Sequence, residues 1–283
     1  MKQDIILSKS LIIFTVSIVG LLLSCKSNVI TDDYKPQYDS VYIQQKIEQY
    51  YTNNQTDSML NFIEKWHTSI KPSSEKYIHQ NDTIANIYQI VADLFKPYQF
   101  SDHTPYRHVD YNTRQYSIPK NKCIVFQTDV DYLVLPLEKF KKVNAYVYFK
   151  PHTLHNFRPQ LISDSVKYLY LTKEYQTAIL KFLKNKNTDI ENLNDLKNDS
   201  FVNEINKRED FLFHLLNIQR GHWKGWHIPT FPSIEKIIFD INLQNAFINV
   251  RIDYGQTIEN YKLVKENGHW KDGKNNFVII RQE

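Results

Sequence analysis

The densest group of side chains that could do chemistry lies in residues 220–230, which read Arg-Gly-His-Trp-Lys-Gly-Trp-His-Ile-Pro-Thr. This corner holds two of the six glycines, two of the four tryptophans and two of the ten histidines of the 283-residue chain. Glycine allows backbone conformations that other residues avoid, and tryptophan combines a large apolar ring with a polar N–H group. The composition therefore predicts a shaped corner, whose candidate ligand-binding residues are Arg220, His222, Trp223, Trp226 and His227.

Two functional interpretations of this corner compete with a structural one. His222 and His227 supply two ligands of a zinc site, which needs a third from elsewhere, such as His214 or Asp240. The two tryptophans, with Arg220 and Lys224, instead form a platform for a sugar, a peptide or an anion. Structurally, the same indoles are a hydrophobic plug between a helical part and the strands that follow. The sequence favours the plug, because both flanking segments need an apolar joint here, and it assigns no metal or cofactor.

Other polar groups have simpler explanations. The pairs His103/His108 and His152/His155 can each supply half of a zinc site but are more typical of solvated loops. Asp129 with Asp131 can bind a cation or share a proton but is more typical of the solvent face of a strand. The chain lacks the Gly-x-Ser-x-Gly elbow, the phosphate loop, Gly-x-Gly-x-x-Gly, Cys-x-x-Cys and His-Glu-x-x-His. No standard catalytic motif therefore assigns a reaction.

Cys25 is the residue with the most definite chemistry, because of what precedes it. Residues 1–24 combine Lys2 and Lys9 with an apolar run at 11–23, a pattern typical of a secretory signal peptide. That run is shorter than the roughly 20 residues that span a bilayer. A cysteine thiol directly after the leader is a nucleophile that can accept a lipid.

Residues 22–25, Leu-Leu-Ser-Cys, resemble the lipobox of bacterial lipoproteins. This resemblance implies that Cys25 receives a diacylglyceryl group, that the leader is cut before it, and that its new amino terminus is acylated. Several acyl chains anchor a protein far better than one. Because Lys26 rather than an aspartate follows Cys25, the resemblance favours the outer membrane, with the body periplasmic or surface-exposed. The lipid bilayer is thus the expected partner.

Composition limits the rest of the chain. It is 42% hydrophobic and 14% aromatic, which indicates a folded body. Lys2, Lys9 and Asp4 give the leader +1 of the formal net charge of +4, which leaves +3 with both signs interspersed. This balance argues against a nucleic-acid partner. Cys123 lies in an apolar run and is expected to be a buried, inert thiol, so the body is held by its core rather than by disulfides.

The order of patterns predicts three domains: a signal peptide at 1–24, a polar tether at 25–38 and a single body at 39–283. Apolar spacing predicts helices at 39–51 and 57–70, the second capped by Thr56 or Asp57, and a third that begins at Asn81 and stops before Pro97. A turn at 72–74 separates the last two helices. A later helix is expected at 169–183 with Thr172 as its cap, before a polar insertion near 184–200. The apolar spacing of residues 201–216 predicts a helix at its start, and its end fits a helix or a strand.

Strands alternate with turns in the remaining segments. Residues 111–118, 123–126, 132–135 and 146–149 are strand-like, and residues 234–280 alternate with a period of two, with Asn267-Gly268 as a hairpin turn. Helices first and an antiparallel sheet last predict an α+β fold that closes in a carboxy-terminal β-meander. This meander is similar to that of the nuclear-transport-factor-2-like family in the order of its elements, which implies a concave sheet.

Two functional hypotheses follow. The first is a membrane-anchored envelope lipoprotein that acts as a non-catalytic binding, assembly or inhibitory module, such as an immunity protein. The second is a lipid-anchored hydrolase with a histidine-based site, with or without zinc, around His222 and His227. Residues 208–212, the Gly-His-Trp-Lys-Gly-Trp-His run and Pro232 resemble uncharacterised lipoproteins of Gram-negative envelopes, which implies an address and an architecture but no activity.

Overall fold

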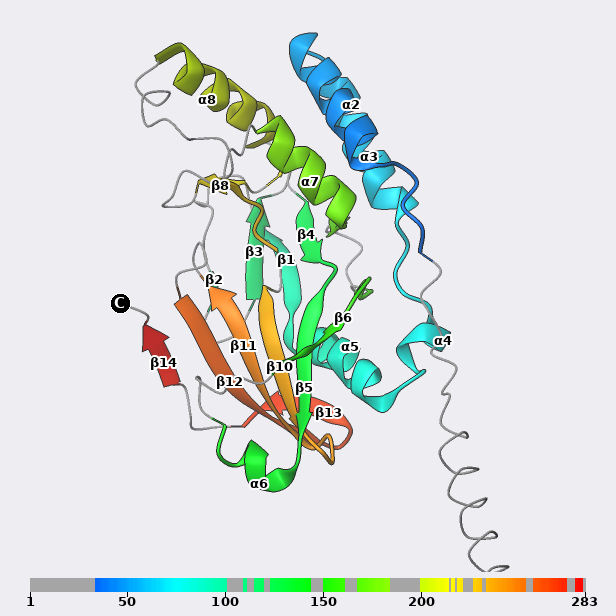
Figure 1. Ribbon diagram of the computed structural model, residues 1–283, viewed down its shortest axis with the longest axis vertical. Helices are drawn as coiled ribbons and strands as arrows, with labels where there is room; N and C mark the ends of the chain where they lie inside the picture. Colours follow the sequence, from blue (N-terminus) through cyan, green and yellow to red (C-terminus); the bar gives the residue numbers. More distant parts are fainter. Residues whose placement is uncertain are drawn as a thin grey trace, which may run out of the picture. The chain divides into compact units, whose positions relative to one another are not determined.

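The computed structural model describes residues 34–100, 109–110, 115–119, 123–143, 150–160, 167–183, 199–213, 215–216, 218–220, 226–230, 233–252, 257–273 and 278–281. The chain divides into two units, Met1–Thr31 and Asp32–Glu283, and all of these residues belong to the second unit. Figure 1 shows the helices and strands of this second unit in colour.

Four helices open the described chain: α2 (Ser40–Thr52), α3 (Thr56–Ser69), α4 (Glu75–Ile78) and α5 (Asp82–Leu94). The three predicted helices are confirmed. The Asn81 side chain accepts hydrogen bonds from the backbone N–H groups of Thr83 and Ile84, as its cap role requires. The predicted cap of α3 is wrong, because Gln55 occupies the cap position and makes no capping bond with its side chain. The additional short helix α4 follows the predicted turn and is capped by Ser74.

The later helices are α6 (Leu137–Phe140), α7 (Lys173–Phe182) and α8 (Asp199–Phe213). The prediction of helix from residue 169 is wrong in its first turn, because Tyr168–Leu171 forms strand β7. Parallel pairing with another strand and burial of Leu169 and Tyr170 stabilise the extended form there. Helix α8 begins inside the predicted polar insertion, of which residues 184–198 lie outside the described residues.

The described strands form four sheets. The largest has seven strands in the order β13-β12-β11-β10-β5-β6, with β14 paired to β12. Its members are β5 (Val130–Leu135), β6 (His152–Leu154), β10 (Ile234–Asp240), β11 (Asn245–Ile252), β12 (Thr257–Glu266), β13 (His269–Asp272) and β14 (Val278–Arg281). Two smaller sheets join β1 (Lys96–Phe100), β2 (Val109–Asp110) and β3 (Gln115–Pro119), and β4 (Ile124–Gln127) with β7.

The α+β class and the closing β-meander are confirmed. Strands β10 to β13 pair antiparallel with their chain neighbours, and the turn between β12 and β13 has positive φ at Asn267 (51°) and Gly268 (81°), as a hairpin dipeptide requires. The sheet as a whole is mixed, because β5 joins β10 in parallel. Two further parallel pairs, β1 with β3 and β4 with β7, lie outside the predicted antiparallel pattern. The predicted strand at 146–149 lies outside the described residues.

One apolar core links the helices to the large sheet. Ile237 and Phe239 of β10 belong to this core, whereas Ile238 belongs to a small cluster with Leu133, Leu135 and Phe140. Because successive residues of a strand point to opposite faces, the two clusters lie on the two faces of the sheet. Helix α5 docks on the meander through polar contacts. Its Asp93 accepts the backbone N–H of Trp270 at 2.8 Å, and its Asn86 accepts the Trp270 indole N–H at 3.0 Å.

The segment before α2 is already part of the body. Tyr34 and Tyr38 pack against the main core, and the ring of Tyr34 lies 4.5 Å from the guanidinium carbon of buried Arg158. The predicted tether, residues 25–38, therefore overlaps the body at its end, and the boundary lies no later than Tyr34. The sequence favours a later boundary because the run from Ser27 to Tyr38 is polar, with Asp32, Asp33 and Pro36.

Candidate functional site

The segment at residues 220–230, which we call the glycine-tryptophan corner, lies in a hairpin. Strand β8 (Gln219–Arg220) pairs antiparallel with β9 (Trp226–His227), so that Arg220 lies opposite Trp226. His222, Trp223 and the intervening glycines lie outside the described residues, and so do the side chains of Arg220 and His227. Of the five predicted ligand-binding side chains, Trp226 is therefore the one whose surroundings can be examined.

Trp226 lies in the core. Its side chain packs into the main apolar cluster, the residue is 5% exposed, and its indole N–H donates to the carbonyl of Leu183 at 3.1 Å. Leu183 ends α7, where the last carbonyls of a helix have no partner within the helix. Trp226 thus joins β9 to the end of α7, which is the role of the predicted plug and differs from that of a ligand platform.

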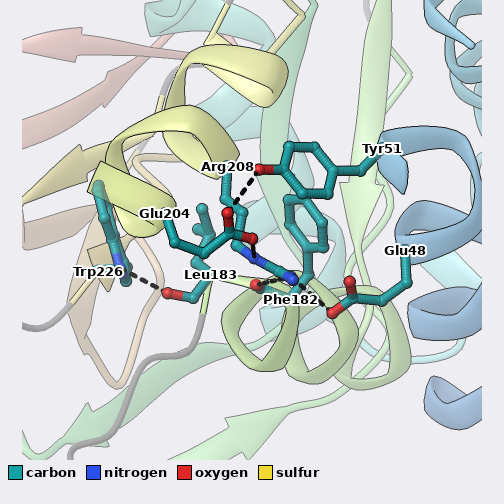
Figure 2. Close-up of polar contacts among 7 residues, drawn as sticks. All are labelled: Glu48, Tyr51, Phe182, Leu183, Glu204, Arg208 and Trp226. Atoms are coloured by element: carbon teal, nitrogen blue, oxygen red, sulfur yellow. Dashed lines mark hydrogen bonds and ion pairs between the residues drawn. The ribbon is translucent and has the colours of Figure 1, made fainter. Parts of the chain in front are cut away.

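A buried cation lies close to this joint (Figure 2). Arg208 of α8 donates to the Glu48 carboxylate of α2 at 2.6 Å, to the Glu204 carboxylate one turn earlier at 2.9 Å, and to the carbonyl of Phe182 at the end of α7 at 3.0 Å. Its guanidinium carbon also lies 5.0 Å from the ring centre of Tyr51 and 4.9 Å from that of Phe182. One side chain therefore connects α2, α7 and α8.

The electrostatics of this cluster suit a permanent charge. Burial alone would lower the pKa of Arg208, but its hydrogen bonds to Glu48 and Glu204 outweigh burial and raise the pKa above its ordinary value. Burial and the neighbouring Glu204 carboxylate raise the pKa of Tyr51, whose hydroxyl donates to Glu204 at 3.2 Å. Neither group exchanges protons near neutral pH. The hydrogen bonds of Arg208 hold the three helices together.

The sequence contains a signal for this cluster, although its role was not predicted. Ile205, Arg208 and Leu212 follow the spacing of one helix face, which places a cation among apolar residues. An arginine on a core-facing stripe requires carboxylates from other elements. Nothing in the spacing identified Glu48, which is 160 positions earlier in the chain.

The other predicted polar groups that can be examined pair with each other or support turns. His155 lies 3.1 Å from the Asp129 carboxylate, and Asp131 accepts a hydrogen bond from Thr153 at 2.7 Å. Asp240, a candidate third zinc ligand, is buried and accepts bonds from the Gln244 backbone and the Asn245 amide in the β10–β11 turn. Within the described ranges, no three histidine, cysteine or acidic residues are grouped as metal ligands. His103, His108 and His214 lie outside those ranges.

The two cysteines have separate outcomes. Cys123 is a free thiol that is 7% exposed, which confirms the prediction of a buried thiol, and burial raises its pKa from 9.0 to about 11. Cys25 and the leader lie outside the described residues, so lipidation stays a prediction. In the part of the chain that the structure describes, none of the helices combines the length and apolarity needed to cross a membrane.

Comparisons with known proteins complete these observations. No family model, no curated protein and no solved structure matches this chain. The resemblances to lipobox proteins, to the nuclear-transport-factor-2-like family and to Gram-negative envelope lipoproteins therefore remain predictions from the sequence.

Proposed function

We propose that this chain is a lipid-anchored envelope lipoprotein whose α+β body acts as a non-catalytic binding, assembly or inhibitory module. The observation that carries this proposal is the arrangement of the leader: two lysines, an apolar run and Leu-Leu-Ser directly before Cys25. The anchor places the body on the outer membrane, facing the periplasm or the outside. An immunity protein that neutralises a toxin is one specific form of such a module.

The described body supports a non-catalytic role by the use it makes of its polar groups. Trp226, from the corner that the sequence marks as richest in chemistry, serves as a joint between β9 and α7. Arg208 donates hydrogen bonds to two carboxylates and a carbonyl. Asp240 stabilises a turn. Each of these side chains is hydrogen-bonded within the fold, as buried polar groups that stabilise a fold are.

Metabolic labelling with an alkyne fatty acid tests the anchor. The wild-type chain should carry the label and sediment with membranes, and Cys25→Ser should lose both properties because serine lacks the thiol that accepts the lipid. Cys123→Ser is the matched control and should keep the label, since Cys123 is buried in the core. Equal labelling of the Cys25→Ser variant would contradict the proposal.

Metal analysis separates this proposal from the hydrolase hypothesis. The lipoprotein module should purify without stoichiometric zinc and melt at an unchanged temperature after chelation. One zinc per chain, lost in a His222→Ala, His227→Ala double variant, would instead establish the histidine-based site.

A further inference from the structure

The distance between the proposed anchor and the folded body is short. Nine positions separate Cys25 from Tyr34, the first described residue. A fully extended chain covers at most about 3.3–3.6 Å per residue, so this linker spans about 30 Å at most. Tyr34 therefore stays within about 30 Å of the acylated residue if Cys25 carries the lipid.

The contacts of Tyr34 with the body show that the linker to Cys25 ends at this residue. Its ring stacks on the guanidinium of the buried residue Arg158, and burial raises the pKa of the Tyr34 phenol. Tyr38, four residues later, also packs against the core. A cation–π contact of this kind contributes about 0.5–2 kcal/mol, so the segment from Tyr34 to α2 stays on the body.

Helix α2 begins at Ser40 and exposes an amphipathic surface at this point. Val41 is 52% exposed and Tyr42 is 40% exposed, although Ile43 and Ile47 on the other side of the helix are buried. The rings of Tyr38 and Tyr42 stack with their centres 4.7 Å apart, and the Lys46 ammonium lies 5.8 Å from the Tyr42 ring. We call this set the α2 entry surface: Lys35, Tyr38, Val41, Tyr42 and Lys46.

We infer that the α2 entry surface lies against the headgroup region of the bilayer that holds acylated Cys25. This inference rests on the proposed anchor and deepens it by naming the face that meets the membrane. Tyrosine rings are enriched at membrane interfaces because the ring is apolar and the hydroxyl remains hydrated. Lysine side chains extend their ammonium groups toward lipid phosphates while their methylene chains cover apolar surface.

The chain geometry favours the bilayer over a protein partner for this surface. The linker limits how far the start of α2 can move from the membrane, and our inference places the other end of the helix farther from it. Helix α2 has 13 residues, which at 1.5 Å per residue is about 20 Å. Helix α3 returns alongside α2 after the turn at residues 53–55, so its first turns lie at that other end (Figure 1).

Leu60, in the second turn of α3, provides a matched control. It is 46% exposed, close to the value for Val41, but lies toward the opposite end of the helix pair. Val41→Cys and Leu60→Cys can each be labelled with a polarity-sensitive fluorophore in the full lipidated protein. The lipid blocks Cys25, and burial with a pKa of about 11 protects Cys123, so that the new thiol alone reacts.

The labelled proteins are reconstituted into phosphatidylethanolamine/phosphatidylglycerol vesicles that contain nitroxide lipids. The probe at position 41 should shift its emission to the blue and be quenched, and the probe at position 60 should emit as in water. If the probes at the two positions emit equally in vesicles to which the protein is firmly bound, the inference about the α2 entry surface is overturned and the proposed anchor stands. Failure of the unmutated protein to float with vesicles would overturn the anchor and the inference together. Unchanged circular dichroism of both variants establishes that the fold is retained.

Discussion

The indole N–H of Trp226 donates to the carbonyl of Leu183 at 3.1 Å, and this bond ties strand β9 to the residue that ends helix α7. It satisfies a helix-end carbonyl inside the core, where water cannot replace the donor. The chain therefore uses a tryptophan from its most unusual stretch to join a helix to the β8–β9 hairpin.

Two substitutions of Trp226 should separate the contribution of its hydrogen bond to stability from the contribution of its packing. Trp226→Phe keeps most of the apolar contact but leaves the Leu183 carbonyl without its donor, so it should cost about 1–2 kcal/mol of unfolding free energy. Trp226→Ala also creates a cavity and should cost about 3–5 kcal/mol. Urea unfolding followed by circular dichroism measures both losses. Equal stability of the wild type and the two variants would exclude the joint.

The Arg208 cluster should contribute much more to the free energy of unfolding than a surface ion pair does. Arg208→Met removes the positive charge and leaves the carboxylates of Glu48 and Glu204 without their cation. The expected loss of unfolding free energy is about 2–4 kcal/mol. Arg251→Met is the control, because Arg251 contacts Glu235 at the similar distance of 2.9 Å but is largely solvated. Its loss should stay below about 1 kcal/mol. Similar losses in urea unfolding for the two variants would show that the burial of Arg208 is unimportant.

The buried thiol should be protected in the folded protein. Cys123 is 7% exposed with a pKa of about 11, so a thiol reagent at pH 8 should modify it only after unfolding. The Cys25→Ser variant is used so that Cys123 is the single thiol. Mass spectrometry after iodoacetamide treatment, with and without guanidinium, measures the difference. Rapid modification of the folded protein would place the thiol at the surface.

The same pKa predicts how stability depends on alkaline pH. Between pH 9 and about 11 the unfolded thiol loses its proton while the folded thiol keeps it, so the unfolded state is favoured as pH rises. The contribution of the protonated Cys123 thiol to the stability of the folded state is fully present below pH 9 and is lost as the pH rises through about 11. Burial raises the pKa of Tyr170 and Tyr175 as well, which adds loss of the same sign above pH 10.

Cys123→Ala isolates the thiol's part of this loss. Two pKa units correspond to about 2–3 kcal/mol, so the fall in unfolding free energy between pH 9 and 11 should be smaller by up to that amount in the variant. Urea titrations at several pH values measure the two slopes. Parallel slopes for the wild type and the variant would contradict a raised pKa of Cys123.

The β12–β13 turn allows a test of backbone strain alone. Gly268 has φ of 81°, and a Cβ atom added there would meet nothing within 4 Å, so Gly268→Ala is strained without a clash. It should cost about 1 kcal/mol, and Gly268→Asn should cost less because asparagine adopts this conformation more readily. Thermal unfolding of the wild type and of the two variants measures these losses. A loss as large for asparagine as for alanine would point to a contact in place of strain.

Local elements were predictable where local chemistry decides them. Asn81 caps α5 through bonds to residues two and three positions later, and Asn267-Gly268 supplies the two positive φ values of its turn. Residues 168–171 were predicted less well because their apolar spacing fits a helix or a strand, and pairing with β4 decided the outcome. Nothing near Gln55 indicates in advance that α3 begins without a side-chain cap.

The sequence by itself determined the leader pattern before Cys25, the α+β class and the alternation that produces the meander, because each depends on residues that are neighbours in the chain. The tertiary structure decided that Trp226 supports α7, that Arg208 reaches Glu48, and that Tyr34 and Tyr38 belong to the body. These contacts join positions up to 160 residues apart. Such partners are selected because their surfaces bury apolar area together and pair buried polar groups, which depends on the assembled fold.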